Sequence, residues 1–96
     1  MHKKLVFEWD EDKNLLNQRK HGISFETAAF VFEDKNYIEM YDFEHSIDED
    51  RYIAIGCVAD VLFVVFTERK ERIRLFSARL ATETERRLYY DQNIHY

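Results

Sequence analysis

The longest apolar run of the chain lies in its second half and predicts a central strand. Residues 61–66 read VLFVVF, six apolar residues without a break. A strand buried on both faces has this pattern, whereas a strand with one solvated face alternates apolar and polar residues. After a turn at residues 70–71, arginines alternate with apolar residues over 72–75. We therefore predict an adjacent strand that carries Arg72 and Arg74 on one face and apolar side chains on the other.

The alternation breaks at Phe76 and Ser77. If period two continued, Phe76 would fall on the arginine side and Arg79 on the apolar side. A β-bulge inserts one residue into a strand and restores the phase beyond it. We predict a bulge or bend near Phe76 and Ser77, because only then does Arg79 share a face with Arg72 and Arg74.

Two capped helices precede these strands. Asp10 is a good N-cap for a helix over residues 11–20, with acids in its first turn, bases in its last and Gly22 just beyond it. This helix has few apolar residues, chiefly Leu15–Leu16, so we expect it on the surface. Ser24 then caps a second helix with an apolar stripe at i, i+3, i+4 and i+7. The residues of that stripe are Phe25, Ala28, Ala29 and Phe32.

The remaining pattern completes an α+β domain. Thr82 to Glu85 is a capping box, T-x-x-E, which starts a last helix in which we expect Leu88 to pack inward. Short turns between consecutive strands indicate a small antiparallel sheet with helices packed on one face, in the order β-α-α-β-β-β-β-α. We predict a single domain over residues 1–96. Three further strands complete the sheet, at residues 5–7, 37–43 and 51–59.

Composition and charge exclude several classes of protein. No apolar run approaches the ~18 residues that span a membrane, and the N-terminus does not have the pattern of a signal peptide. The single cysteine, Cys57, rules out an internal disulfide. We therefore expect a cytoplasmic protein without a membrane partner.

The net charge of −5 is distributed unevenly. Residues 33–50 hold eight acids against one base, whereas residues 61–90 hold seven bases against four acids. Such a dipolar surface guides an anion to one face. We predict that the acidic stretch lies away from the basic face, because acids beside a phosphate site would repel the substrate.

Six short motifs follow one another in order along nearly the whole chain. The motifs are Phe7-Glu8-Trp9-Asp10, Lys20-His21-Gly22, Arg51-Tyr52-Ile53-Ala54-Ile55-Gly56, Thr67-Glu68-Arg69, Arg72-Ile73-Arg74-Leu75-Phe76-Ser77-Ala78-Arg79 and Glu85-Arg86-Arg87-Leu88-Tyr89. Each motif is weak alone, but the set is specific and resembles the BrnT toxins of bacterial type II toxin–antitoxin systems. Two departures from the family pattern are visible: the turn at Lys70 lacks a glycine, and Leu80 stands where a second arginine often follows Arg79.

The resemblance implies a RelE-like ribonuclease fold and metal-independent RNA cleavage that inhibits translation. It also implies neutralisation by a small antitoxin of the ribbon-helix-helix type, similar to BrnA, through which the chain would meet DNA only indirectly. Leu80 in place of an arginine removes one positive charge from the site that the family pattern implies.

The chemistry of RNA cleavage gives an independent expectation for the site. Without a metal, the 2′-hydroxyl attacks the adjacent phosphorus, and the enzyme must stabilise negative charge and move protons. Arginine suits the first task because its planar fork holds two phosphate oxygens and stays charged. The candidate arginines are Arg69, Arg72, Arg74 and Arg79.

The sequence offers two candidates for the residue that moves the proton, and each has a structural explanation as well. His21 has the right ordinary pKa, but its place at a helix end equally fits a partner for the helix dipole. Glu85 is a second candidate, although the capping box also accounts for it. We expect Lys20, Arg86 and Tyr89 to bind RNA. The four histidines and the cysteine have no metal-ligand spacing, so we predict no metal site and no cofactor.

A second function fits the same arginines. The arginines could form a solvated strand face paired with nearby glutamates, and the chain would then be a non-catalytic module that binds RNA or protein. Both hypotheses require exposed arginines. A neighbouring reading frame that encodes a small ribbon-helix-helix protein would favour the toxin. The neighbouring acids are Glu68, Glu71, Glu83 and Glu85.

Overall fold

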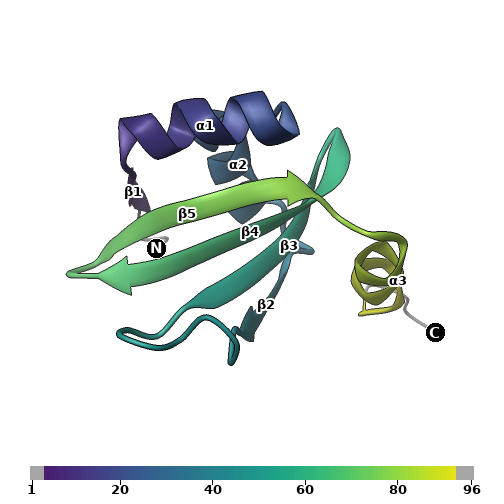
Figure 1. Cartoon of the computed structure of the whole chain (residues 1–96). Helices are drawn as coiled ribbons and strands as arrows, with labels where there is room; N and C mark the ends of the chain where they lie inside the picture. The colour runs from purple at the N-terminus through teal and green to yellow at the C-terminus, as the bar shows by residue number, and fades with distance from the viewer. Residues whose placement is uncertain (1–3, 93–96) are drawn as a thin grey trace.

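A five-stranded sheet in the order β1-β5-β4-β3-β2 forms the body of the molecule (Figure 1). The computed structural model describes residues 4–92. It confirms the α+β class and the predicted order of elements, with one additional 3₁₀ helix. The elements are β1 (Val6–Glu8), α1 (Glu11–His21), α2 (Phe25–Ala29), η1 (Phe30–Glu33), β2 (Ile38–Tyr41), β3 (Tyr52–Val58), β4 (Asp60–Arg69), β5 (Arg72–Leu80) and α3 (Glu83–Gln92).

The antiparallel pairing predicted from short turns is confirmed for β2 to β5. β1 differs, because it lies parallel to β5 with Val6 opposite Arg72 and Glu8 opposite Arg74. No short turn joins these two strands, so the rule that consecutive strands run antiparallel does not apply to them. The parallel register places the Glu8 carboxylate beside two of the arginines of β5.

The predicted helix caps are present. The Asp10 carboxylate accepts hydrogen bonds from the backbone N–H groups of Asp12 and Lys13, at 2.8 and 3.3 Å. Gly22 ends α1 with φ of +71°, a left-handed conformation that costs glycine little. The Ser24 hydroxyl accepts from the N–H of Thr27 at 3.0 Å and so begins α2. Local sequence therefore sets both helix boundaries.

Polar side chains, rather than leucines, dock α1 on the sheet. Leu15 and Leu16 are 49% and 61% exposed, whereas Asn14 and Asn17 are buried. The Asn17 amide donates to the carbonyl oxygens of Ile23 and Ala78, both at 2.8 Å. Its oxygen accepts from the Ala78 N–H at 3.1 Å. Asn17 therefore fastens the helix directly to the backbone of β5.

The predicted apolar stripe of the second helix is interrupted after Ala29. The chain tightens there into η1, so that Val31 is fully buried and Phe32 only partly. Val31 packs against β3, where a Cβ atom on Gly56 would stand 2.7 Å from its Cγ1. Glycine is therefore needed at position 56 for the close approach of η1 to the sheet.

The last helix presents a different residue to the interior than expected. The prediction that Leu88 packs inward is wrong: Leu88 is 37% exposed, and Tyr89 is buried beside Ile55 and Val61. The Tyr89 hydroxyl donates to the carboxylate of Asp34, and burial raises the pKa of this phenol. This bond anchors α3, which lies beyond the end of the sheet in Figure 1.

Candidate active site

A bulge in β5 sets the geometry of the open face of the sheet. Val65 pairs with Ser77 and Phe66 with Leu75, so Phe76 is an extra residue with no partner residue on β4. The predicted bulge is thereby confirmed. Because the phase shifts by one residue at this point, the arginines on both sides of it share a single face. These arginines are Arg72, Arg74 and Arg79, and the opposite face carries the buried side chains of Ile73, Leu75 and Ala78.

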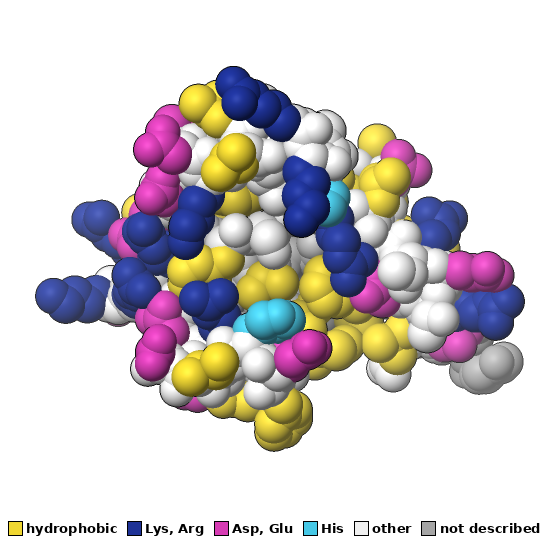
Figure 2. All heavy atoms as spheres, viewed as in Figure 1, with side chains coloured by type: hydrophobic (Ala, Val, Ile, Leu, Met, Phe, Trp, Pro, Cys, Tyr) yellow, Lys and Arg dark blue, Asp and Glu magenta, His cyan; other side chains and the backbone are white. Residues whose placement is uncertain are grey.

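The helix α1 and the bulge enclose an open groove of about 540 Å³. Basic side chains of α1 form one wall, and Phe76 and Ser77 form the other. Figure 2 shows this side of the molecule as a hollow with hydrophobic and neutral atoms at its floor and lysines, arginines and histidines around it. We call it the α1 groove. It is lined by Lys13, Leu16, Asn17, Arg19, Lys20, His21, Phe76 and Ser77.

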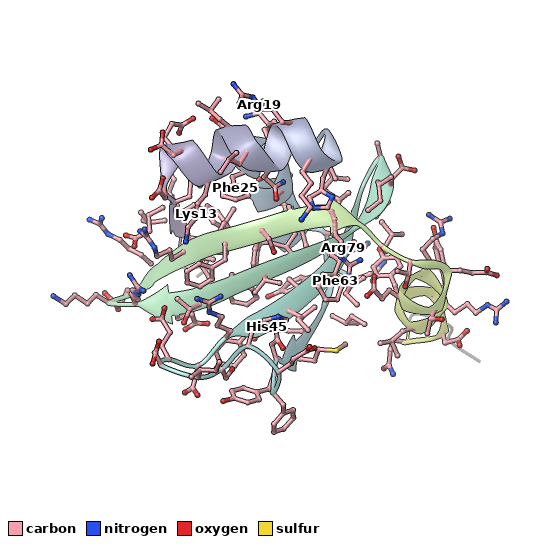
Figure 3. All side chains as sticks on the ribbon, in the orientation of Figure 1. Lys13, Arg19, Phe25, His45, Phe63 and Arg79 are labelled. Carbon is pink, nitrogen blue, oxygen red and sulfur yellow. The ribbon has the colours of Figure 1, made fainter. Side chains whose placement is uncertain are left out.

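A second, smaller hollow of about 190 Å³ continues the α1 groove across the sheet. It shares Lys13, Phe76 and Ser77 with the groove, so one continuous depression crosses the bulge. We call this hollow the bulge pocket. Its other walls are Val65 of β4 and two residues of the segment between β2 and β3, His45 and Arg51. In Figure 3, Lys13 comes from α1 and His45 from that segment, on the two sides of the sheet face.

Two cations lie over an aromatic ring at the junction of the two hollows. The Arg51 guanidinium carbon is 4.0 Å from the centre of the Phe76 ring, and the Lys13 ammonium is 5.7 Å from it. Cation–π attraction of this kind favours the positive charges at this spot. The junction can therefore offer an aromatic face and two cations to a nucleotide.

Arg79 lies further along the same face and is already engaged. Its guanidinium donates two hydrogen bonds to the Glu85 carboxylate, at 2.8 and 3.0 Å, and lies 4.0 Å above the Phe63 ring. The hydrogen bond from Arg79 is the main cause that lowers the pKa of Glu85. Glu85 also forms the predicted capping box, accepting from the Thr82 N–H at 2.8 Å. A phosphate at Arg79 must therefore compete with Glu85 for the guanidinium fork.

The other predicted arginines gather at the far end of the β4–β5 hairpin. Arg74 and Arg72 lie 3.1 and 3.6 Å from the Glu8 carboxylate. Four residue steps in the paired ladder separate Arg74 from Arg79, or roughly 13 Å at 3.3 Å per residue. The bulge thus puts these arginines on one face, but they do not meet at one point.

The acidic stretch does not stay away from the basic face, so that prediction is wrong. Glu49 accepts two hydrogen bonds from Arg69, at 3.0 and 2.7 Å, and this contact lowers the pKa of the Glu49 carboxyl. The segment between β2 and β3 folds back toward β4, where the Thr67 hydroxyl donates to the carbonyl oxygen of Asp50. The acidic segment lies beside the basic strand because the Glu49 and Arg69 side chains attract each other, and this attraction outweighs the separation of acidic and basic residues along the sequence.

The remaining predicted residues lie in different environments. Lys20 and His21 line the α1 groove, as a site there requires. Arg86 is on α3, with its guanidinium 5.8 Å from the Tyr90 ring. Tyr89 is 6% exposed, so its ring does not offer a stacking face to solvent. Sequence reasoning did not select four residues of the depression, since no spacing rule joins them: Lys13, His45, Arg51 and Phe76.

Comparisons with known proteins place the chain in a class. The sequence matches the family described as the ribonuclease toxin, BrnT, of type II toxin–antitoxin systems, over residues 9–85. The fold is similar to the crystal structure of the Brucella abortus ribonuclease toxin, BrnT, with a TM-score of 0.65 and 22% sequence identity. This similarity covers 83% of the chain and 100% of the Brucella protein. A search of curated proteins found no match.

The chain is therefore a ribonuclease toxin of a type II toxin–antitoxin system. Within that class it belongs to the BrnT family, as the match over most of its length shows. Of the segments that the structure describes, no helix combines the length and the apolar character that a membrane crossing requires.

Proposed function

We propose that the chain is an endoribonuclease that cleaves RNA without a metal ion in the depression formed by the α1 groove and the bulge pocket. Cleavage of RNA would inhibit translation. A small cognate antitoxin, of the BrnA-like ribbon-helix-helix type, would neutralise the chain by covering this face and would carry the DNA-binding function of the complex.

The convergence of basic side chains on one depression of an acidic chain carries this proposal. The chain has a net charge of −5, yet α1, β3 and their connections bring Lys13, Arg19, Lys20 and Arg51 to the rim of continuous hollows. Such a focus of positive charge attracts a polyanion and aligns its phosphates. A base that replaces the Arg51 guanidinium over the Phe76 ring can stack there, a contact worth ~1–3 kcal/mol.

The chemistry of the donor set supports a reaction without a metal. Over residues 4–92, no group of three or more histidine, cysteine, aspartate or glutamate side chains stands close enough to hold an ion. Arginine and lysine can stabilise the developing negative charge in its place, since they stay charged through the reaction. Arg79, and the hairpin arginines Arg69, Arg72 and Arg74, extend the basic surface along which the RNA strand would run.

A cleavage assay with Arg79→Ala tests the proposal. The parent should arrest growth when expressed without antitoxin and should cut RNA in excess chelator. Arg79→Ala should lose both activities while its fold persists, because ion pairs of partly exposed side chains contribute at most ~1 kcal/mol. Arg79→Lys should recover only part of the activity, since the charge returns without the two-point fork.

Arg87→Ala is the matched control. Arg87 also pairs with a glutamate, Glu83, at 2.8 Å, but this pair stands exposed on α3. Its loss should leave cleavage unchanged. Complete loss of parent activity in chelator, with recovery on adding magnesium, would contradict the metal-free reaction. Binding of RNA without cleavage would assign the chain to non-catalytic RNA-binding modules.

A further inference from the structure

Asp42 and His45 form a dyad at the edge of the bulge pocket. The His45 Nδ1 lies 2.9 Å from the Asp42 Oδ2, and the His45 backbone N–H donates to Oδ1 at 3.2 Å. Asp42 is buried, whereas the His45 side chain is 57% exposed. An ionised carboxylate only accepts hydrogen bonds, so it selects the tautomer in which Nδ1 carries the proton. The Nε2 atom is then the free basic nitrogen.

The segment that carries the dyad is held in place by its own hydrogen bonds. The Ser46 hydroxyl donates to the Asp42 carbonyl oxygen at 2.6 Å and accepts from the Arg51 N–H at 2.8 Å. The Asp42 N–H donates to the Arg51 carbonyl oxygen at 2.9 Å. The imidazole is therefore presented from a braced turn. Within residues 4–92, the hydrogen bonds of the His45 ring are confined to Nδ1.

The surroundings of His45 suit a reacting phosphodiester. The bulge pocket sets the imidazole among Lys13 of α1, Arg51 of the connecting segment and the uncharged residues Val65, Phe76 and Ser77. His45 also lines a second small hollow, with Ile47, Asp48, Glu49 and Arg51. Two cations can thus hold the phosphate while a neutral imidazole approaches the sugar. His21, by contrast, lies in the α1 groove, and within residues 4–92 no hydrogen bond or ion pair joins its ring to a carboxylate.

We propose that His45 is the general base of the cleavage reaction and that Asp42 is its positioning residue; this inference rests on the proposed ribonuclease function. Nε2 takes the proton of the 2′-hydroxyl as O2′ bonds to phosphorus. The bond between phosphorus and O5′ breaks, and the leaving oxygen takes a proton from solvent water. The products are a 2′,3′-cyclic phosphate and a 5′-hydroxyl. The buried Asp42 carboxylate stabilises the imidazolium that forms.

Single-turnover cleavage of a short RNA, measured across pH, tests the role of His45. His45→Ala should slow cleavage by about 10²–10⁴-fold, the usual contribution of a positioned base. Its affinity for a 2′-O-methyl RNA of the same sequence should stay within about threefold of the parent, because this analogue binds without reacting. The rise of rate with pH in the parent should be lost in the variant. Added imidazole should restore part of the rate to His45→Ala.

Two further variants define the dyad and its control. Asp42→Asn should lower the rate while the variant still binds the methylated RNA, because the imidazolium loses its charged partner. Ile47→Ala changes a residue of the same segment that is 85% exposed and lies outside the bulge pocket, and it should cleave as the parent does. Unfolding midpoints of all variants would be compared, since cleavage is interpretable only for folded protein.

The outcomes separate this inference from the proposed function. If the parent cleaves RNA and His45→Ala cleaves equally fast with the same pH profile, His45 is not the base, and the ribonuclease assignment stands. If His45→Ala loses affinity for the methylated RNA in proportion to its rate, His45 binds substrate and does not move the proton. If the parent does not cleave RNA at all, both the proposed function and this inference fail.

Discussion

Replacing Asn17 should loosen the attachment of α1 to the sheet and with it the wall of the α1 groove. The Asn17 side chain makes three hydrogen bonds to backbone groups of Ile23 and Ala78. Asn17→Ala removes all three and leaves those buried groups without partners. At ~1 kcal/mol net for each bond, the expected loss of unfolding free energy is ~3 kcal/mol.

Asn17→Asp keeps the size of the side chain and changes only its hydrogen bonds, so it separates their contribution to stability from that of packing. One carboxylate oxygen can still accept from the Ala78 N–H, but the other faces two carbonyl oxygens and repels them. This near-isosteric change should therefore destabilise the fold at neutral pH at least as much as Asn17→Ala. A protein of this size loses ~4–8 °C of melting temperature per kcal/mol. Both variants should consequently melt about 12–24 °C below the parent.

Urea and thermal unfolding followed by circular dichroism would measure these losses. Gln18→Ala is the control, because Gln18 is exposed on the same helix and its side chain makes one weak bond to Asn14, at 3.3 Å. Its change should stay within ~0.5 kcal/mol. If Asn17→Ala unfolds within ~1 kcal/mol of the parent, the polar attachment of α1 contributes little, and the apolar contacts of the helix must hold it.

Two further predictions concern the framework of the site. Gly56→Ala should lower the free energy of unfolding by ~1–3 kcal/mol, because its Cβ would stand 2.7 Å from Val31 Cγ1. The shift of the urea midpoint measures this loss. An unchanged midpoint would show that η1 moves away from the sheet without a cost in stability. Arg79 lowers the pKa of Glu85 below the ordinary value of 4.5, so the paired carboxylate stabilises the fold above that pH and stops doing so as pH falls through the lowered value. Glu85→Gln should therefore be less stable than the parent at pH 7, with the difference shrinking below pH 4.5; a difference independent of pH would refute the ionic contribution.

Local rules in the sequence account for most element boundaries and for the bulge. Capping chemistry at Asp10 and Ser24 is written in consecutive residues, and the failed alternation at Phe76 is visible without any partner strand. Local rules could not predict which side of α3 faces the interior. Two adjacent residues, Leu88 and Tyr89, are both apolar enough to be buried, and the Asp34 acceptor that favours Tyr89 lies 55 residues away.

The parts of the site that sequence reasoning missed depend on contacts between distant segments. A helix with few apolar residues suggested a loosely placed surface element, yet Asn17 binds the backbone of a residue 61 positions later. His45 is an ordinary polar residue of an acidic segment until that segment folds beside the bulge. The predicted arginines were visible as charges, but their glutamate partners depend on tertiary contacts between separate elements, as for Arg74 and Glu8.

The parallel pairing of β1 with β5 has a consequence for the synthesis of the chain. Val6 meets Arg72, 66 residues later, so β1 finds its neighbour only when most of the protein has been made. At about 5–20 residues per second, a ribosome needs roughly 3–13 seconds to cover that interval. During this time neither the bulge strand nor its arginines exist, and the helices have no β5 to pack against. On the proposed assignment of the site to the depression beside β5, the nascent chain has no active site until β5 is made, and an antitoxin made at the same time has several seconds to be present before its target folds.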